Sequence, residues 1–390
     1  MKPLYIISGI PPGPSGTGRF VDYLKDQGAN LVCPPLPKEP ISHMLREGRI
    51  LSLLFERIFN YFYSLVFNFK IKSLERKKNL HLLILHPQRL GLQRTIRLIN
   101  NTAADVWIYI LDNSYFCVRS YNYIPGTNEP CLKCLGGDLQ EQKNNHCQPF
   151  PEPTSYATEY IKELQDRVRE GKVKLMAQSR SQASLAEKHF AVDVPVVGLW
   201  AKDWDEVFEQ ITPAKKATEY WDVVYHGFQQ DAKGAGWLLE VASLCPELKF
   251  LFPFPKLWLL NNENKGNKNC TFKYVKWEDG LEEAVASARI TVVPSLWSAS
   301  IEGSLVKSLV VAKAVAVVQV ESAFSNELPE NLLLKLPANP EQAALKLKQS
   351  IQQNWQPDAR LKQKWINEFE SINRNTMNSI VNEIQGNADS

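Results

Sequence analysis

The sequence predicts an α/β protein made of two domains, each with a parallel sheet covered by helices. Short apolar segments rich in β-branched residues alternate with helical patterns along both halves of the chain, as expected where strands are joined by helical crossovers. The chain has 390 residues, of which 44% are hydrophobic and 22% are charged, and this is enough for two separate cores. The boundary between the halves is expected within 195–216, where Val194–Leu199 ends the first domain and the stretch Thr212–Lys216, with its Pro and two Lys residues, forms a linker.

The first domain is expected over residues 1–200 and begins with a strand at Leu4–Ser8. This apolar run is too short for a signal peptide, so we expect a cytoplasmic protein. An irregular, cysteine-rich insertion at 113–150 interrupts the later alternation of strands and helices. The further strands predicted in this domain are Ala29–Cys33, Leu80–His86, Asp105–Asp112 and Val173–Ala177.

The second domain is expected over residues 217–360 and repeats the same alternation. Residues 361–390 follow it and have a helical pattern. The net charge of the chain is only +3, which gives no indication of nucleic-acid binding. The strands predicted here are Trp221–His226, Lys249–Pro253, Thr271–Val275, Ile290–Pro294 and Ala314–Val318.

Residues 44–72 form an unusually apolar and aromatic helical segment, in which polar residues recur every three or four positions. One interpretation is a helix buried between the sheet and its neighbours. The other is a helix lying at a membrane surface, with Lys70, Lys72 and Arg76–Lys78 contacting anionic lipid. No apolar run reaches the roughly 20 residues of a transmembrane helix, so any membrane contact would be peripheral.

Four of the seven cysteines fall in the insertion: Cys117, Cys131, Cys134 and Cys147. The close pair offers two thiolates from one tight turn, and the outer two complete a tetrahedral set, so a structural Zn²⁺ is the first interpretation. An iron–sulfur cluster also takes four thiolates and stays open, as do free thiols grouped by chance. Disulfides are disfavoured in a chain without a secretory signal.

The most informative stretch runs from Val292 to Val317. It reads as a strand, a loop containing Pro294-Ser295, a helix opened by Glu302-Gly303-Ser304, and a second β-rich run. Ligands of open α/β sheets bind where strand ends meet helix N-termini, and the helix dipole there favours phosphate. This stretch resembles the donor-binding signature of family 4 glycosyltransferases, which have the GT-B fold of two Rossmann-like domains facing a cleft.

The match to this signature is partial. The family's helix carries two glutamates eight positions apart, and the corresponding residues here are Ala299 and Lys307. Glu302 lies three residues after the first of these positions and is placed to take over hydrogen bonding to the donor.

Two other blocks resemble the same family. Tyr225-His226-Gly227-Phe228 with Lys233-Gly234 is similar to its Gly-Arg and Lys-Gly block, in which the two cations neutralise the donor diphosphate. Lys233 matches, whereas Phe228 stands at the Arg position. The loop with Gly16 and Gly18 is similar to the family's first glycine loop, which approaches the donor or acceptor.

The resemblance implies a retaining glycosyltransferase that moves a sugar from a nucleotide-sugar to a polysaccharide or lipid-linked acceptor in cell-envelope or polysaccharide synthesis. It gives catalytic roles to Lys233 and Glu302, acceptor-side roles to His86 and Asp112, and implies that 361–390 crosses back onto the first domain. The donor-binding residues that it implies are Gly16, Gly18, Gly227, Lys233, Trp277, Ser295, Glu302, Gly303 and Ser304.

Two other functions stay open. The departures at Phe228, Ala299 and Lys307 are compatible with a non-catalytic scaffold that serves as the partner of another transferase. A metal or redox sensor built on the cysteine cluster is the third interpretation, although such a task does not need two full domains.

Overall fold

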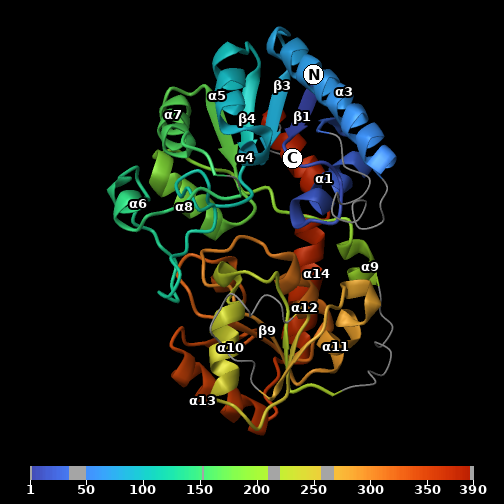
Figure 1. Ribbon diagram of the computed structural model, residues 1–390, viewed down its shortest axis with the longest axis vertical. Coiled ribbons are helices and arrows are strands. Elements are labelled where there is room, and N and C mark those ends of the chain that lie inside the picture. The colour runs from blue at the N-terminus through green and yellow to red at the C-terminus, as the bar shows by residue number, and fades with distance from the viewer. Residues whose placement is uncertain (1, 35–49, 152, 210–219, 256–267, 387–390) are drawn as a thin grey trace.

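The structure is a computed structural model that describes residues 2–34, 50–151, 153–209, 220–255 and 268–386. It contains two parallel sheets, one in each half of the chain, with helices packed around both (Figure 1). This confirms the predicted fold class of two parallel-sheet α/β domains.

The first sheet has the strand order β2-β1-β3-β4-β5, and every pair in it is parallel. Its central strand β3 is buried along its whole length, which explains why His81–Leu85 is apolar at nearly every position rather than alternating. The strands are β1 (Leu4–Ser8), β2 (Asn30–Val32), β3 (His81–Leu85), β4 (Asp105–Tyr109) and β5 (Val173–Met176).

The second sheet has the order β11-β10-β9-β6-β7-β8 and is also parallel throughout. Its edge strand β11, which has three residues, was not predicted. The strands are β6 (Val223–Tyr225), β7 (Phe250–Phe252), β8 (Cys270–Phe272), β9 (Ile290–Val293), β10 (Val315–Val318) and β11 (Leu334–Leu336).

Helices connect the strands and cover both sheets (Figure 1). In the first half they are α1 (Gly16–Asp26), α3 (Ile50–Glu75), α4 (Pro87–Leu90), α5 (Leu92–Asn101), α6 (Gln140–Asn144), α7 (Ala157–Arg169) and α8 (Arg180–Phe190). After them come α9 (Trp204–Glu209), α10 (Ala235–Ser243), α11 (Leu281–Ser287), α12 (Gly303–Val311), α13 (Pro340–Gln352), α14 (Ala359–Asn373) and α15 (Thr376–Gln385). Short 3-10 turns lie at η1 (Asp231–Lys233), η3 (Trp277–Asp279) and η4 (Phe324–Asn326).

The last two helices run from the second half back to the first. Phe369 of α14 packs against Trp204, with ring centroids 5.8 Å apart. The Tyr23 hydroxyl of α1 donates to the Arg374 carbonyl at 2.9 Å and accepts from the Met377 backbone N–H at 3.2 Å, so α15 is held against α1. Ile380 is fully buried in the same apolar cluster as Phe20.

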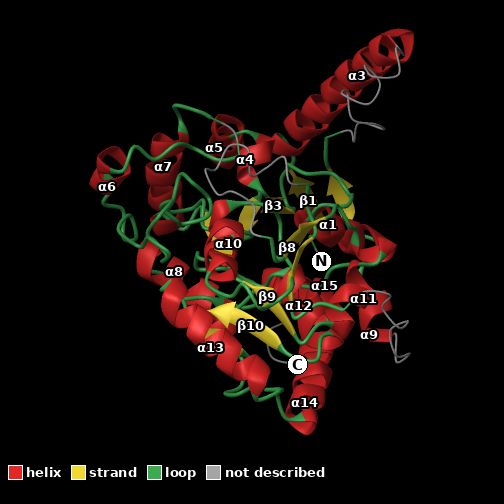
Figure 2. Ribbon diagram, turned by 60° about the horizontal axis from the view of Figure 1, so that its bottom comes forward, coloured by secondary structure: helices red, strands yellow, loops and turns green. Residues whose placement is uncertain are grey.

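The interpretation of segment 44–72 as a helix buried between the sheet and its neighbours is wrong for α3. Of its described residues, Phe67, Ile71 and Leu74 are buried against the first domain, whereas most of 55–69 is exposed, because the helix projects beyond the sheet (Figure 2). Residues 44–49 of the predicted segment lie outside the described residues. No helix in the described part of the chain is long and apolar enough to cross a membrane.

The chain passes between the domains twice, near Leu199 and at the end of α14, and a buried amide connects these two segments. Asn373, at the end of α14, accepts a hydrogen bond from the Leu199 backbone N–H at 2.9 Å and donates to the Phe369 carbonyl at 2.9 Å. Because Asn373 is buried, replacing it would leave the Leu199 N–H without a partner in the interior.

We therefore expect Asn373→Ala to lower the free energy of unfolding by about 1–3 kcal/mol in urea titrations. The matched control is Asn367→Ala on the exposed side of the same helix, whose amide accepts only from Gln363 at 2.9 Å. Equal stability of the two variants would contradict a structural role for the Asn373 amide.

Candidate functional site

The carboxyl ends of the two sheets meet at the candidate site. The segment after β4 contacts the segment after β9, because Asn113 Nδ2 donates to the Ser298 carbonyl at 3.0 Å and Ser300 Oγ donates to the Leu111 carbonyl at 3.4 Å. In open α/β sheets this edge is where ligands bind, so the strands bring the predicted side chains to the expected place.

A buried hydrogen-bond cluster holds these two segments together. Asn113, Asn122 and Ser298 are all nearly inaccessible to solvent. The Ser298 backbone N–H donates to Asn122 Oδ1 at 3.1 Å, and Asn122 Nδ2 donates to Ser298 Oγ at 3.1 Å. Asn122 belongs to the cysteine-rich insertion, so this insertion supplies part of the contact between the domains. Sequence reasoning missed this role, because an asparagine in a loop gives no specific signal.

On the side of the second sheet, the structure brings Lys233, Glu302 and Ser295 together. The Lys233 ammonium forms an ion pair with Glu302, and Ser295 Oγ donates to Glu302 Oε1 at 3.0 Å. The rings of Trp297 and Tyr121 lie 4.7 Å and 5.2 Å from Lys233 Nζ, and both stabilise the cation. Tyr121 comes from the first domain, so this lysine is enclosed from both sides.

Gly234 explains why Lys233 reaches this position. It has a positive φ of 71°, and a Cβ atom there would lie 1.9 Å from the Pro294 carbonyl oxygen, which no side chain could tolerate. The turn that carries Lys233 can therefore pack directly on the exit of β9. Glycine is required here for close approach as well as for its backbone conformation.

A second charged cluster lies beside the first and includes residues without a sequence signal. Lys307 of α12 forms an ion pair with Asp203, and Asp203 also pairs with Arg19 of α1 at 2.9 Å. Burial lowers the pKa of Lys307, while the charge of Asp203 opposes that shift. Asp203 lies in the linker between the domains, where no motif indicates it.

Trp277 and His226 stack in this second cluster. Their ring centroids are 5.1 Å apart, and Lys307 Nζ lies 4.7 Å from the Trp277 ring. His226 Nδ1 is 2.8 Å from Ser308 Oγ. Burial, reinforced by the positive charge of Lys307, lowers the pKa of His226 to about 3, so the imidazole is neutral at physiological pH.

The predicted glycines and Ser304 lie at the ends of the elements concerned. The Gly18 N–H already donates to Ser15 Oγ at 3.0 Å, which caps α1, so it is not available to a donor phosphate in this conformation. Gly16 opens the same helix, Gly227 follows β6, and Gly303 and Ser304 form the first turn of α12.

On the side of the first sheet, Asp112 belongs to a polar network. Gln88 Nε2 donates to both carboxylate oxygens of Asp112 at 3.0 Å and to Ser120 Oγ at 3.2 Å. His86 has a left-handed backbone and accepts from the Arg89 N–H at 3.4 Å, which caps the short α4. Both predicted acceptor-side residues therefore lie at the carboxyl ends of neighbouring strands.

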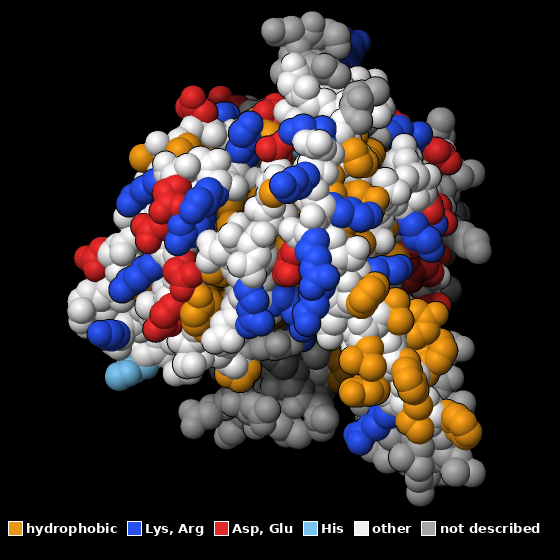
Figure 3. Space-filling model, turned by 90° about the horizontal axis from the view of Figure 1, so that it is seen from above, with side chains coloured by type: hydrophobic (Ala, Val, Ile, Leu, Met, Phe, Trp, Pro, Cys, Tyr) orange, Lys and Arg blue, Asp and Glu red, His pale blue; other side chains and the backbone are white. Residues whose placement is uncertain are grey.

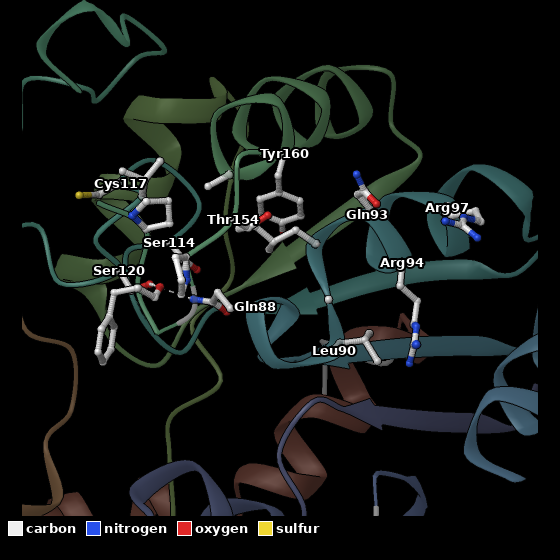
Figure 4. Close-up of a pocket in the computed structure, with 17 residues that line it drawn as sticks. Gln88, Leu90, Gln93, Arg94, Arg97, Ser114, Cys117, Ser120, Thr154 and Tyr160 are labelled. Carbon is white, nitrogen blue, oxygen red and sulfur yellow. Dashed lines mark hydrogen bonds between the residues drawn. The ribbon is translucent and has the colours of Figure 1, made fainter. Parts of the chain in front are cut away.

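A polar cavity of about 430 Å³ opens beside this network (Figure 4). Gln88 and Tyr160 line its inner wall, and Arg94 and Arg97 of α5 line its outer part. Gln88 Oε1 is buried and has no hydrogen-bond partner among the described residues, so it can accept from a hydroxyl group in the cavity. No sequence pattern indicates this cavity, because it forms only when the insertion folds over α4 and α5.

The four cysteines of the insertion line a common small cavity. Burial and the neighbouring thiols raise the pKa of Cys117 well above its usual range, and the same two causes raise that of Cys134 to about 11. This donor set is suited to zinc, but the described residues include no group of three or more His, Cys, Asp or Glu side chains arranged to hold a metal ion. The predicted zinc site is therefore without support from the arrangement of the side chains.

Comparison with known proteins establishes the fold. No known family matches the sequence, and no curated protein matches it. The structure is similar to sucrose-phosphate synthase from Thermosynechococcus elongatus, with 12% identity, 100% of both chains covered and a TM-score of 0.60. It is also similar to Anabaena HepE in complex with UDP and glucose, with 11% identity, 97% of this chain and 99% of that chain covered, and a TM-score of 0.56.

A further similarity is to S. aureus TarM in complex with fondaparinux, α-GlcNAc-glycerol and UDP, at 12% identity and a TM-score of 0.47. This match covers 80% of this chain and 58% of the TarM chain, and it carries no weight in the interpretation. Together with the two facing parallel sheets, the stronger similarities show that the chain has the GT-B fold of glycosyltransferases. Membership of family 4 stays a prediction.

The buried imidazole of His226 makes stability depend on pH. Below a pH of about 6.5 the unfolded chain takes up a proton on this residue, whereas the folded protein does not until the pH approaches 3. Stability therefore falls as the pH falls through this window, by up to about 1.4 kcal/mol per pH unit for one such group.

In His226→Gln this contribution to the pH dependence should disappear, which urea unfolding between these pH values would measure. His189, whose pKa burial lowers to about 4, and His81, whose pKa burial also lowers, stay in the variant and supply the remaining slope from histidine. An unchanged slope would show that His226 is protonated in the folded state.

Proposed function

We propose that this protein is a glycosyltransferase that moves a sugar from a nucleotide-sugar donor to a polysaccharide or lipid-linked acceptor in cell-envelope or polysaccharide synthesis. The observation that carries this proposal is the convergence of Lys233, Ser295 and Glu302 at the carboxyl end of the second sheet. The similarity to HepE, solved with UDP and glucose, supports a nucleotide-sugar as the donor.

In this proposal Lys233 neutralises the leaving diphosphate. A negative charge develops on that group as the bond to the sugar breaks, so a fixed cation lowers the barrier. Glu302 holds Lys233 in place before the donor binds. When a phosphate group of the nucleotide-sugar pairs with Lys233 in place of Glu302, the Glu302 carboxylate can accept a hydrogen bond from a hydroxyl group of the nucleotide-sugar.

The start of α12 supports the same role. Glu302 is the N-cap of this helix but makes no capping hydrogen bond with its side chain, so the N–H groups of Gly303 and Ser304 are candidates for binding phosphate. Catalysis would then depend on positioning and on stabilising the leaving group, with retention of configuration and without a dedicated base.

We place the acceptor on the side of the first domain. The cavity beside Gln88 offers an unpaired carbonyl oxygen to a sugar hydroxyl, and Asp112 is held by the same glutamine. His86 and Asp112 would border the acceptor, and the reaction would take place in the cytoplasm.

A non-catalytic scaffold is the second candidate. Phe228, at the position of the family's Arg, is 70% exposed, and the Lys233 charge is already compensated by Glu302. Both observations are compatible with a site that has lost its donor. The experiment below distinguishes the two candidates.

Purified protein should melt at a higher temperature in the presence of one nucleotide diphosphate or nucleotide-sugar, because a ligand that binds only the folded state stabilises it. A ligand at about 100 times its Kd would add about 2.7 kcal/mol. We expect UDP or a UDP-sugar to give the shift, and Lys233→Ala to abolish both the shift and sugar transfer.

The control for this variant is Lys346→Ala, which removes an exposed lysine in the middle of α13, a helix that carries none of the predicted donor residues. Loss of the shift in both variants would indicate a general defect. The absence of any nucleotide shift in folded wild-type protein would favour the scaffold.

A structural zinc ion remains a proposal for the cysteine-rich insertion. The proposal rests on the donor chemistry of four thiols that line one cavity, and it requires them to move closer together than they are in this structure. Metal binding would deprotonate Cys117 and Cys134 despite their raised pKa values. We expect metal analysis to find about one zinc ion per chain, and Cys131→Ser with Cys134→Ser to lose it and destabilise the domain. Cys245→Ser, at a buried cysteine of the second domain, is the control. A metal-free and folded wild-type protein would refute the proposal.

A further inference from the structure

Helix α3 carries an exposed row of large apolar side chains. Phe55, Phe62 and Phe69 are between 60% and 74% exposed, although such residues are normally buried in a folded domain. Ile58, Phe59, Leu65 and Val66 lie between them and are 46–54% exposed. Figure 2 shows the helix projecting from the first domain, and Figure 3 shows hydrophobic side chains gathered along it.

These residues occupy one face of the helix. Their spacing follows the three- and four-residue pattern of a helical stripe from Phe55 to Phe69. At about 1.5 Å per residue the stripe is roughly 20 Å long. Phe67, Ile71 and Leu74 point the other way and anchor the helix to the domain. The apolar face is therefore additional to the residues that the fold needs.

Positive charge surrounds the stripe. The segment 55–78 contains six Lys and Arg residues against two Glu residues. The exposed cations are Arg57, Lys70, Lys72, Arg76, Lys77 and Lys78. Arg94 and Arg97 of the neighbouring α5 are also exposed, and Figure 3 shows Lys and Arg side chains beside the apolar area. Tyr61 and Tyr63 add rings with a polar end, which suit the interface between water and lipid.

We propose that this surface of α3, with the cations at its carboxyl end, docks onto a bilayer that contains anionic lipid. The aromatic stripe would enter the boundary between head groups and acyl chains, and the lysines would contact the lipid charges. A second copy of the chain would instead bring the same cations against one another, so charge complementarity favours the bilayer.

The docked orientation would also decide how an acceptor reaches the protein. This step rests on the proposed function. Arg94 lies over the Phe67 ring of α3 at 5.9 Å and also lines the polar cavity beside Gln88 (Figure 4). That cavity therefore lies beside α3, on the side of the helix that anchors it to the domain, and its exposed Arg94 and Arg97 add to the cations near the stripe. A lipid-linked acceptor would present its anionic head group to Arg94 and Arg97 without leaving the bilayer.

Vesicle flotation tests the docking surface. The full-length protein is mixed with vesicles of phosphatidylcholine alone, or with about one quarter of the lipid replaced by phosphatidylglycerol. We expect it to float with the anionic vesicles, less strongly at high salt, and weakly with the neutral ones. The triple variant Phe55→Ser, Phe62→Ser and Phe69→Ser should partition at least about tenfold less, because it removes the apolar anchor.

Two matched controls accompany this variant. Tyr274→Ser, Leu345→Ser and Ile372→Ser remove three apolar side chains that are 66–67% exposed elsewhere, and they should leave flotation unchanged. Lys70→Gln with Lys72→Gln should weaken binding to anionic vesicles only, whereas Lys346→Gln with Lys364→Gln should not. Melting temperatures show that each variant is folded.

Failure to float, or equal flotation of the wild type and the triple variant, would overturn the proposal. So would a dimer in light scattering that the triple variant dissociates and that does not bind vesicles, because the partner would then be a second copy. No donor or acceptor is present in the assay. A chain that floats but transfers no sugar therefore retains its docking surface and loses only the proposed activity.

Discussion

The arrangement of the site depends on one buried hydrogen-bond cluster between the carboxyl ends of the two sheets. Asn113 and Asn122 satisfy the backbone of Ser298 in a place that water does not reach, so separating them would expose unpaired donors and acceptors. This contact fixes the loop after β9, and that loop carries Ser295 and Trp297 toward Lys233. The cysteine-rich insertion thus affects the candidate donor site through Asn122 and Tyr121, although its cysteines lie elsewhere.

The sequence was sufficient to predict the architecture, because buried parallel strands leave continuous apolar runs. β1 was predicted to the residue, whereas the strand expected at Asp105–Asp112 ends at Tyr109, where the chain leaves the sheet toward the insertion. The convergence of Lys233 and Glu302 followed from motifs at strand ends, since such ends share one edge of a sheet. Asp203 could not be predicted, because its partner Lys307 is 104 positions away and no sequence motif includes Asp203.

The departures from the family signature acquire a physical meaning in the structure. Lys307, at the position of a glutamate, is buried and compensated by Asp203, so the charge reversal is accommodated by a residue of the linker. Ala299 is buried in the core of the second domain, where a carboxylate would lose its contact with water. Glu302 is the carboxylate that lies beside Lys233 instead.

The exposed face of α3 could not be distinguished from a buried one by composition, because both require the same residues.

The two chain crossings between the domains touch each other, and this limits how the domains can move. The first passes through Gly198, whose carbonyl accepts from the Tyr109 hydroxyl at 2.6 Å, and the second passes through Asn373, bound to the neighbouring Leu199. A Cβ atom on Gly198 would lie 2.5 Å from Asn373 Oδ1, so the crossings are in direct contact. Two covalent connections that meet at one point act as a single hinge. Any rotation of one domain against the other would then turn about Gly198 and Asn373, with the largest displacement at loops remote from them. A side chain at position 198 would change the angle between the domains.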